Sequence, residues 1–166
     1  MSDPKPPLLP GDPRNPRRMK RRARKGLETS IERFGDIAGI TFNETTQQLV
    51  TGHQRMKALQ TIAERDGFEL RLEPVDEHQS WVILPAHRGP RGIQVPEHRF
   101  PVRIVHMTAE EQLAANLTAN NAAIQGEYTS DAAGLANEIA ALDQQLAEDL
   151  LIGDVADQII QGANTP

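Results

Sequence analysis

Residues 48–60, with the sequence QLVTGHQRMKALQ, change from a strand-like to a helix-like pattern at Gly52. The neighbouring elements can be worked out from this junction. The apolar run that ends at Thr51 is typical of a short strand, whereas the residues from His53 onward have the spacing of a helix. Thr51 and Gln54 stand three residues apart, as the two members of a capping box do. We therefore expect a strand, a glycine and a capped helix in direct succession.

The same junction can also hold a ligand. Gly52 has no side chain to keep a ligand away from the backbone, and the free N–H groups at a helix start bind anions. Arg55 adds a charged donor that pairs well with phosphate oxygens. A cap does not occupy every free N–H group, so the cap and the phosphate site are compatible interpretations of these residues.

Periodic patterns on either side of the junction predict further elements. Leu27, Ile31 and Phe34 recur at helical spacing, and Gly35 then stands where helices commonly end. Alternation of apolar and polar residues, with a turn between, indicates a small β-hairpin before Gly52. The expected elements are a helix at 17–34, strands at 40–43 and 48–51, and a helix from 53 to about 66.

A strand-rich region follows, and helices come after it. Thr108 and Glu111 fit a second capping box, at the start of a helix that runs to about Ile124. The expected strands lie at 68–75, 81–84, 93–95 and 102–105, with an inserted hairpin at about 76–99 before a core strand. The last elements are an amphipathic helix marked by Leu135, Ile139, Leu142 and Leu146 and a short helix around 155–160.

The composition limits the class of protein. A chain of 166 residues with 38% hydrophobic residues suits one globular domain. Aromatic residues make up only 4%, which argues against an aromatic platform for single-stranded nucleic acid. There is no cysteine, which excludes disulfides, thiolate metal sites and cysteine nucleophiles. No apolar run is long enough for a signal peptide or a membrane span, so we expect a cytoplasmic protein.

The charges are divided unevenly along the chain. Residues 1–25 carry nine Lys or Arg and two Asp, whereas the remaining residues carry nine basic and 21 acidic groups. So dense a basic block indicates a polyanion such as DNA as a partner, or docking on the acidic C-terminal helices of the same chain. The candidate DNA-binding residues are Arg14, Arg18, Lys20, Arg21, Arg22, Arg24 and Lys25.

Five segments together resemble the ParB/sulfiredoxin-like superfamily, and most closely the short ParB-like nuclease domain proteins of phages and bacteria. These proteins are often found beside or fused to DNA methyltransferases. The segments are NPRRM at 15–19, LETSIERFGDIAGITFN at 27–43, LVTGHQRMKAL at 49–59, FPVRIV at 100–105 and AANLTANNAAIQGEY at 114–128. The resemblance covers about residues 13–150. It implies association with DNA, and a DNA methyltransferase or another phage protein as a partner. It also leaves homodimerisation open.

The resemblance also implies a nucleotide site. The Gly-x-x-Arg box of ParB-type domains contacts a nucleoside triphosphate and corresponds to Gly52, His53, Gln54 and Arg55; the Asn-Pro-Arg element corresponds to Asn15, Pro16 and Arg17. A Glu-Asn pair that helps to hold Mg²⁺ in nucleotide-hydrolysing ParB proteins corresponds to Ala119-Asn120, so the acid is missing here. The implied cofactor is CTP or another nucleoside triphosphate with Mg²⁺. Nuclease and nucleoside triphosphatase activities are both left open.

Asn120 also attracts attention through its position on a helix. Leu113, Leu117, Asn120 and Ile124 fall on one stripe that we expect to be buried, with Asn116 one turn earlier. A buried amide needs hydrogen-bond partners. Asn120 is therefore either a structural amide that ties its helix to a neighbouring loop or a residue that faces the pocket beside Gly52.

Two residues are candidates for catalysis. His53 occupies a position that other branches of the superfamily use in phosphate transfer, and Glu127 is the nearest acid downstream of Asn120 that could act as a ligand or base. Their structural alternatives are a polar histidine at a helix start and an exposed loop glutamate. The other histidines are scattered, without the close pairing typical of a metal site, so no firm metal site is expected.

These patterns combine into an α+β fold with a ParB/sulfiredoxin-like core, in which helices pack on a small mixed sheet. The expected parts are a basic, proline-rich extended arm at 1–16, a ParB-like domain at 17–128 and an acidic helical extension at 129–166. The leading hypothesis is a DNA-associated protein with a nucleotide or phosphate pocket. The alternatives are a non-catalytic interaction adaptor with a degenerate pocket, and nucleotide-dependent phosphotransfer.

Overall fold

A computed structural model of the chain describes residues 7–121, 131–155 and 157–158. The helices are α1 (Arg21–Phe34), α2 (His53–Asp66), α3 (Ala109–Ala119), α5 (Ala132–Leu142) and α6 (Gln144–Asp149), with a 3₁₀ turn at Pro90–Gly92. The strands are β1 (Ile40–Asn43), β2 (Gln48–Thr51), β3 (Arg71–Pro74), β4 (Gln79–Leu84), β5 (His87–Arg88), β6 (Gln94–Val95) and β7 (His98–Val105). None of the described helices is long and apolar enough to cross a membrane.

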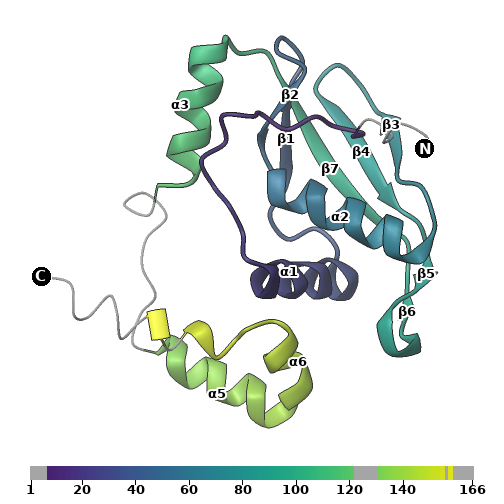
Figure 1. The fold of residues 1–166 in the computed structure, drawn as a ribbon, viewed down its shortest axis with the longest axis vertical. Coiled ribbons are helices and arrows are strands. Elements are labelled where there is room, and N and C mark those ends of the chain that lie inside the picture. The colour runs from purple at the N-terminus through teal and green to yellow at the C-terminus, as the bar shows by residue number, and fades with distance from the viewer. Residues whose placement is uncertain (1–6, 122–130, 156, 159–166) are drawn as a thin grey trace, which may run out of the picture.

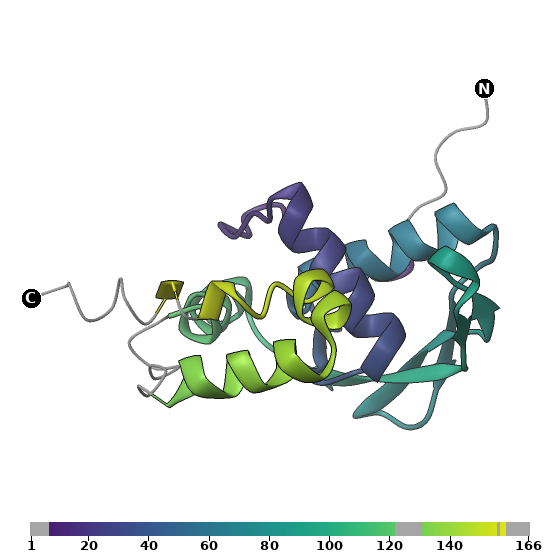
Figure 2. The same ribbon diagram turned by 90° about the horizontal axis from the view of Figure 1, so that it is seen from below.

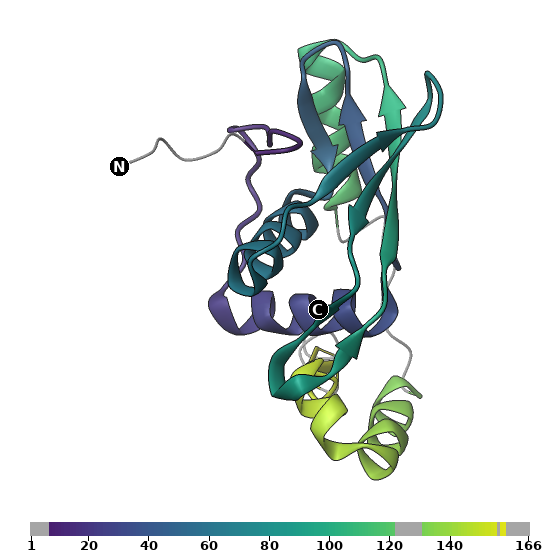
Figure 3. The same ribbon diagram turned by 90° about the vertical axis from the view of Figure 1, so that its right-hand side faces the viewer.

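Five strands form one mixed sheet in the order β2-β1-β7-β4-β3 (Figure 1). Only β1 and β7 run parallel, with Ile40 opposite Val102, and the other neighbours are antiparallel. Helices α1 and α2 cover one face of this sheet (Figure 3). The core between them includes Ile31, Leu59 and Phe100, each at most 2% exposed. The expectation of an α+β fold with a small mixed sheet and packed helices is confirmed.

The junction at Gly52 has the expected strand and helix but a different cap. Thr51 is the last residue of β2, and Gly52 is the N-cap of α2, without a side-chain hydrogen bond to the helix start. Gly52 has φ of 89°, in the left-handed region that glycine adopts without strain. The Gln54 amide instead donates to the backbone carbonyl of Arg17 at 3.1 Å. The capping box expected from Thr51 and Gln54 is therefore wrong, because the strand pairing of Thr51 with Thr41 keeps it in the sheet.

The strand β4 corrects the boundaries of the expected insertion at 76–99. It lies between β7 and β3 in the main sheet, paired along its length with β7. Val82, Ile83 and Leu84 are fully buried there, so this segment supplies core. Among the described residues, only β5 and β6 form strands outside the main sheet, as a separate two-stranded sheet.

The N-terminal arm packs against the domain over its described part. Leu9 is 5% exposed and belongs to the core cluster, and the Leu49 N–H donates to the Pro10 carbonyl at 2.8 Å. In Figure 1 the arm crosses the strands toward α3 and then turns to enter α1. The boundary expected at residue 16 does not separate an unattached arm from the domain, since a buried leucine lies on its N-terminal side.

The C-terminal helices differ from the single amphipathic helix expected at 135–146. The Asp143 side chain accepts from the Leu146 N–H at 2.9 Å, so a new helix begins there. Leu135, Ile139 and Leu142, expected to face a core, are 58%, 38% and 89% exposed. Helix α6 lies beside α1 (Figure 2), where a side chain at Gly26 would come within 3.3 Å of the Asp149 carbonyl. Half of the short helix expected at 155–160 lies outside the described residues, and the described positions 155, 157 and 158 are helical.

Candidate functional site

A cavity of about 360 Å³ opens at the N-terminus of α2. Its size is within the range of small-molecule sites. The fold brings together here all seven residues proposed from the sequence to bind nucleotide, which come from the arm, from α2 and from the end of α3. The lining residues are Asn15, Arg17, Ala38, Gly39, Thr51, Gly52, His53, Gln54, Arg55, Asn116, Ala119 and Asn120.

Gly52 and the first three residues of α2 line this cavity. A side chain at Gly52 would meet three atoms of Ile40 at 3.0–3.2 Å, so β1 lies directly against the junction. The first intrahelical bond runs from the Met56 N–H to the Gly52 carbonyl, at 2.9 Å. The N–H groups before Met56 have no partner within the helix and carry the positive end of its dipole. The junction therefore offers an anion a row of donors.

Arg55 supplies one of the two cations of the cavity. Its Nε lies 3.9 Å from Asp36 Oδ1, and its side chain is only 23% exposed. Burial lowers the pKa of the Arg55 guanidinium, and Asp36 opposes this effect, but an arginine remains charged throughout the neutral range. Asp36 also accepts from the N–H groups of Ala38 and Gly39, at 3.2 and 2.9 Å. This carboxylate thus shapes the loop that lines the cavity and holds Arg55 beside it.

Arg17 supplies the second cation, and its position depends on α3. Its Nη1 donates to Asn120 Oδ1 at 2.9 Å, and the Asn120 amide donates to the Asn116 carbonyl at 2.8 Å. The Asn116 amide in turn donates to the Val50 carbonyl at 2.9 Å. Asn120 therefore both ties α3 to the arm and faces the pocket, which are the two roles that the sequence left open.

His53 is held by the arm. The Asp12 N–H donates to His53 Nε2 at 3.0 Å, so this nitrogen is unprotonated and its lone pair is in use. Burial lowers the pKa of His53, the Lys57 charge lowers it further, and Asp12 opposes them. The ring is 7% exposed although it lines the cavity. This arrangement favours a neutral, positioning histidine over one that transfers phosphate through Nε2.

The face of α3 that lies against the domain is polar. Gln112 is fully buried: its amide donates to Asp12 Oδ2 at 2.9 Å, and its oxygen accepts from Asn43 and Thr46. The expected buried stripe through Leu117 is wrong, since Leu117 is 51% exposed and the stripe instead runs through Gln112, Asn116 and Asn120. Ile124 lies outside the described residues. Hydrogen bonds to the arm and to β1 select this face, because leucine cannot provide them.

The lining residues of the cavity carry two arginines and no carboxylate. Ala119, which stands where the resemblance has a metal-holding acid, is itself part of the lining. Glu127, the candidate substitute, lies outside the described residues. The described part of the pocket is therefore suited to polyanionic phosphates, and it supplies amide and backbone groups where a protein ligand for Mg²⁺ would be a carboxylate.

The basic block divides into paired and exposed side chains. Arg14 donates to Asp12, and Arg22 pairs with Asp154 at 2.9 Å, so part of the positive charge is already used within the chain. Arg24 is half-buried beside the arm. The exposed members without such an ion pair in the described structure are Arg18, Lys20, Arg21 and Lys25. Docking on the chain's own acidic C-terminal part thus accounts for Arg22 and leaves most of the block to solvent.

Residues that the sequence did not identify complete the cavity. Sequence motifs did not indicate Ala38 and Gly39, and they indicated Thr51 only as a helix cap and Asn116 only as a neighbour of Asn120; all four line the cavity. The Asp36-Ile37-Ala38-Gly39 turn carried a usable signal, because an aspartate often accepts from the N–H groups two and three residues ahead. The position of Asp36 close to Arg55, in contrast, depends on tertiary structure.

Comparisons with known proteins show similarity in fold. No protein-family model matches the sequence, and no curated protein matches it significantly. Among solved structures, the chain is similar to the C-terminally truncated chromosome-partitioning protein ParB from Caulobacter crescentus, which was crystallised with CTP-γ-S. The two are 15% identical, with a TM-score of 0.52 over 87% of this chain and 67% of that one. The fold is therefore ParB-like.

Proposed function

We propose that the cavity at Gly52 binds the phosphates of a nucleoside triphosphate, with CTP as the first candidate, in a DNA-associated protein of the ParB type. One observation carries this proposal: Arg17 and Arg55 converge from the arm and from α2 on the donor-rich start of α2, in a cavity whose described lining holds no carboxylate. The ParB-like fold supports it, because the similar ParB was crystallised with a CTP analogue.

Each group has a distinct task in this proposal. The N–H groups after Gly52 would bind phosphate oxygens, and the two guanidinium groups would clamp them from both sides. Asn120 and Asp36 would hold the two arginines in place, at the distances seen without ligand. Mg²⁺ would reach the site on the phosphates and keep water as its other ligands, as it commonly does.

The pocket favours binding over hydrolysis. Ala119 provides no carboxylate for a metal ion, and His53 has its Nε2 engaged by the arm. A nucleotide would then act as a ligand that joins the arm, α2 and α3. The adaptor hypothesis remains the second candidate, and the lack of an acid among the described lining residues is the observation that favours it.

Titration calorimetry with CTP, ATP and ADP, each with and without Mg²⁺, tests the proposal. We expect triphosphates to bind more tightly than ADP. Because a charge-assisted hydrogen bond contributes about 1.5–3 kcal/mol, Arg55→Ala and Arg17→Ala should each weaken binding by roughly 10- to 100-fold. Arg55→Lys should lie between, since lysine keeps the charge but lacks the planar fork.

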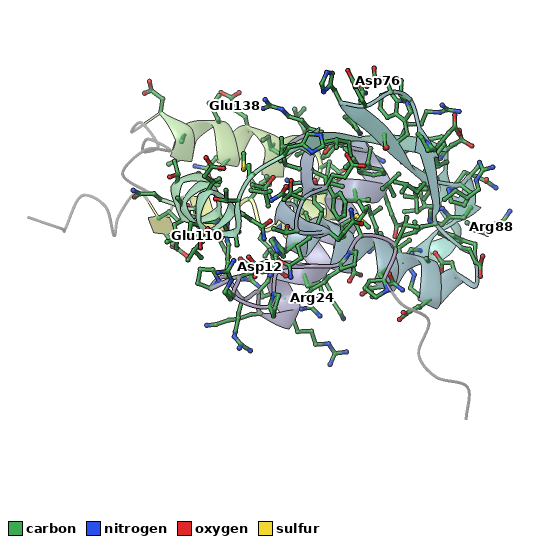
Figure 4. All side chains as sticks on the ribbon, turned by 90° about the horizontal axis from the view of Figure 1, so that it is seen from above. Asp12, Arg24, Asp76, Arg88, Glu110 and Glu138 are labelled. Carbon is green, nitrogen blue, oxygen red and sulfur yellow. The ribbon has the colours of Figure 1, made fainter. Side chains whose placement is uncertain are left out.

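Arg88→Ala is the matched control for these variants. Arg88 is exposed in β5, at the end of the molecule opposite α3, which carries Glu110 (Figure 4). Its removal changes the net charge equally and should leave nucleotide binding unchanged. If the unmodified protein binds none of the three nucleotides, the proposal fails and the adaptor hypothesis takes its place.

A further inference from the structure

Outside the pocket, three side chains from distant parts of the sequence meet between the C-terminal ends of α1 and α2. Glu32 comes from α1, Asp66 is the last residue of α2, and His87 belongs to β5. Their ligand atoms all lie within 4.8 Å of one another. Helix α2 separates this group from Gly52 by roughly 20 Å, at 1.5 Å per residue over its 14 residues.

The His87 ring is fixed so that one nitrogen points at the two carboxylates without a hydrogen bond. Its Nδ1 lies 2.9 Å from the Pro85 carbonyl, which can only accept, so Nδ1 carries a proton. Its Nε2 is buried without a hydrogen-bond partner, in a side chain that is 6% exposed. A histidine that ligates a metal commonly donates its other N–H to a carbonyl in this way.

The distances suit ligands of a shared cation better than a direct ion pair. His87 Nε2 lies 3.5 Å from Asp66 Oδ2 and 4.0 Å from Glu32 Oε2. A charge-assisted hydrogen bond would draw these atoms to about 2.8 Å. Ligands at about 2.1 Å from a tetrahedral metal stand roughly 3.4 Å apart. The two distances from His87 Nε2 are close to this value, and all three atoms lie within 4.8 Å of one another.

The neighbouring residues hold this cluster in place and leave its three side chains 6–16% exposed. A side chain at Gly89 would come 2.5 Å from Glu32 Oε2, so the absence of a side chain there lets the carboxylate lie in its present position without shifting. The Phe68 ring packs at 4.9 Å from the His87 ring. Arg65 Nη2 donates to Glu32 Oε1 at 2.6 Å and to Asp66 Oδ2 at 2.7 Å. In the absence of metal, Arg65 can neutralise the two carboxylates. Because Arg65 is partly exposed, it can also release Asp66 Oδ2 when a cation binds.

We propose that Glu32, Asp66 and His87 form a binding site for a divalent transition-metal cation of the Zn²⁺ class. One imidazole and two carboxylates match the borderline ligand preference of Zn²⁺, and water would complete a tetrahedron. The ion would join α1, the end of α2 and the β5–β6 hairpin. This site does not depend on nucleotide binding at Gly52.

Calorimetry with ZnCl₂ on chelator-treated protein, at neutral pH and without nucleotide, tests the site. We expect one equivalent to bind, and Co²⁺ in its place to give the intense visible absorption of a tetrahedral site. His87→Gln and Glu32→Gln should each weaken binding by about 100-fold or more, since even outer-shell changes cost 10- to 100-fold. Zn²⁺ at 100 times its Kd should raise the Tm by roughly 5–10 °C.

His78→Gln is the control, because His78 lies 3.3 Å from Glu77 as an exposed histidine–glutamate pair. It should bind Zn²⁺ as the unmodified protein does. The proposal is overturned if the unmodified protein takes up no stoichiometric Zn²⁺, or if folded His87→Gln binds it equally well. Should both glutamine variants fail to fold, the Co²⁺ spectrum of the unmodified protein decides, since an octahedral or absent signal also overturns the site.

Discussion

Gly52 meets two requirements that can be separated by experiment. Its φ of 89° is strained for any other residue, and an added side chain would also meet Ile40 at 3.0–3.2 Å. Gly67, at the other end of α2, has φ of 74° but open space around it. A substitution at either glycine therefore has a conformational cost, and a substitution at Gly52 has a steric cost as well.

Gly67→Ala should lower the free energy of unfolding by about 1–2 kcal/mol, the cost of the left-handed conformation. Gly52→Ala should cost roughly 1–3 kcal/mol more, because Ile40 and the start of α2 must move apart. Urea denaturation of both variants measures the difference. Equal losses would show that the approach of β1 is not tight.

His53 predicts how stability depends on pH. Burial lowers the pKa of His53 below its ordinary value of 6.5, so the unfolded chain takes up a proton at a higher pH than the folded one. The free energy of unfolding should then fall as the pH drops through 6.5 and stop falling on this account below the folded-state pKa. The effect is greatest on the acid side of neutrality.

Urea midpoints at pH 7.5, 6.5 and 5.5 measure this dependence. In His53→Gln the decrease should be smaller, since glutamine can accept from the Asp12 N–H but does not titrate. His78→Gln, at an exposed position, should keep the slope of the unmodified protein. A slope that survives in His53→Gln would assign it to other groups.

At the scale of elements, α3 docks through amides. Gln112 bonds to Asp12, Gln48 and Asn43, so it connects the arm and both strands of the first hairpin to one helix. A polar face costs stability unless every group has a partner, but it fixes the position of the helix where an apolar stripe would allow sliding. The precise placement of Asn120 beside Arg17 follows from this docking.

Gln112→Leu should lower the free energy of unfolding by roughly 2–4 kcal/mol, because it leaves the Asp12 carboxylate and the Asn43 amide short of partners. Leu117→Ala, on the exposed side of the same helix, should change it by less than about 0.5 kcal/mol. Thermal and urea denaturation of the two variants give the comparison. A larger loss in Leu117→Ala would restore the apolar stripe as the docking face.

At the scale of the whole molecule, the proposed association with DNA is tested through the basic block at residues 14–25. Arg21 and Lys25 are exposed and stand one turn apart on α1, whereas Arg22 is paired with Asp154. Replacing both Arg21 and Lys25 with alanine should reduce the slope of log K against log salt by about 2, since each phosphate that a basic side chain neutralises adds about 0.9 to it. Sequence preference should not change, because phosphate contacts carry no base information.

Fluorescence anisotropy with a DNA duplex at several salt concentrations measures this slope. The matched control replaces Arg88 and Arg103, which are exposed on β5 and β7, and removes the same charge. An equal change in both double variants would mean that net charge, and not the block on α1, governs binding.

The local patterns of the sequence determined most elements of this protein. The hairpin at 40–51, the helix from His53 and the Thr108–Glu111 capping box need only a few neighbouring residues, and each is present. The Gly-x-x-Arg box and the family resemblance also grouped residues of the cavity into one predicted nucleotide site. The resemblance was needed there, because no periodicity relates Asn15 to Asn120.

Tertiary structure alone decided which polar groups meet. Asp12 with His53, Arg17 with Asn120, and Glu32 with Asp66 and His87 lie far apart in the chain, and their contacts depend on strand order and helix docking. The placement of β4 in the sheet and of Leu117 in solvent was decided in the same way. Periodicity shows which face of a helix or strand is apolar and which is polar. Which other element that face packs against is set by the packing of the whole chain.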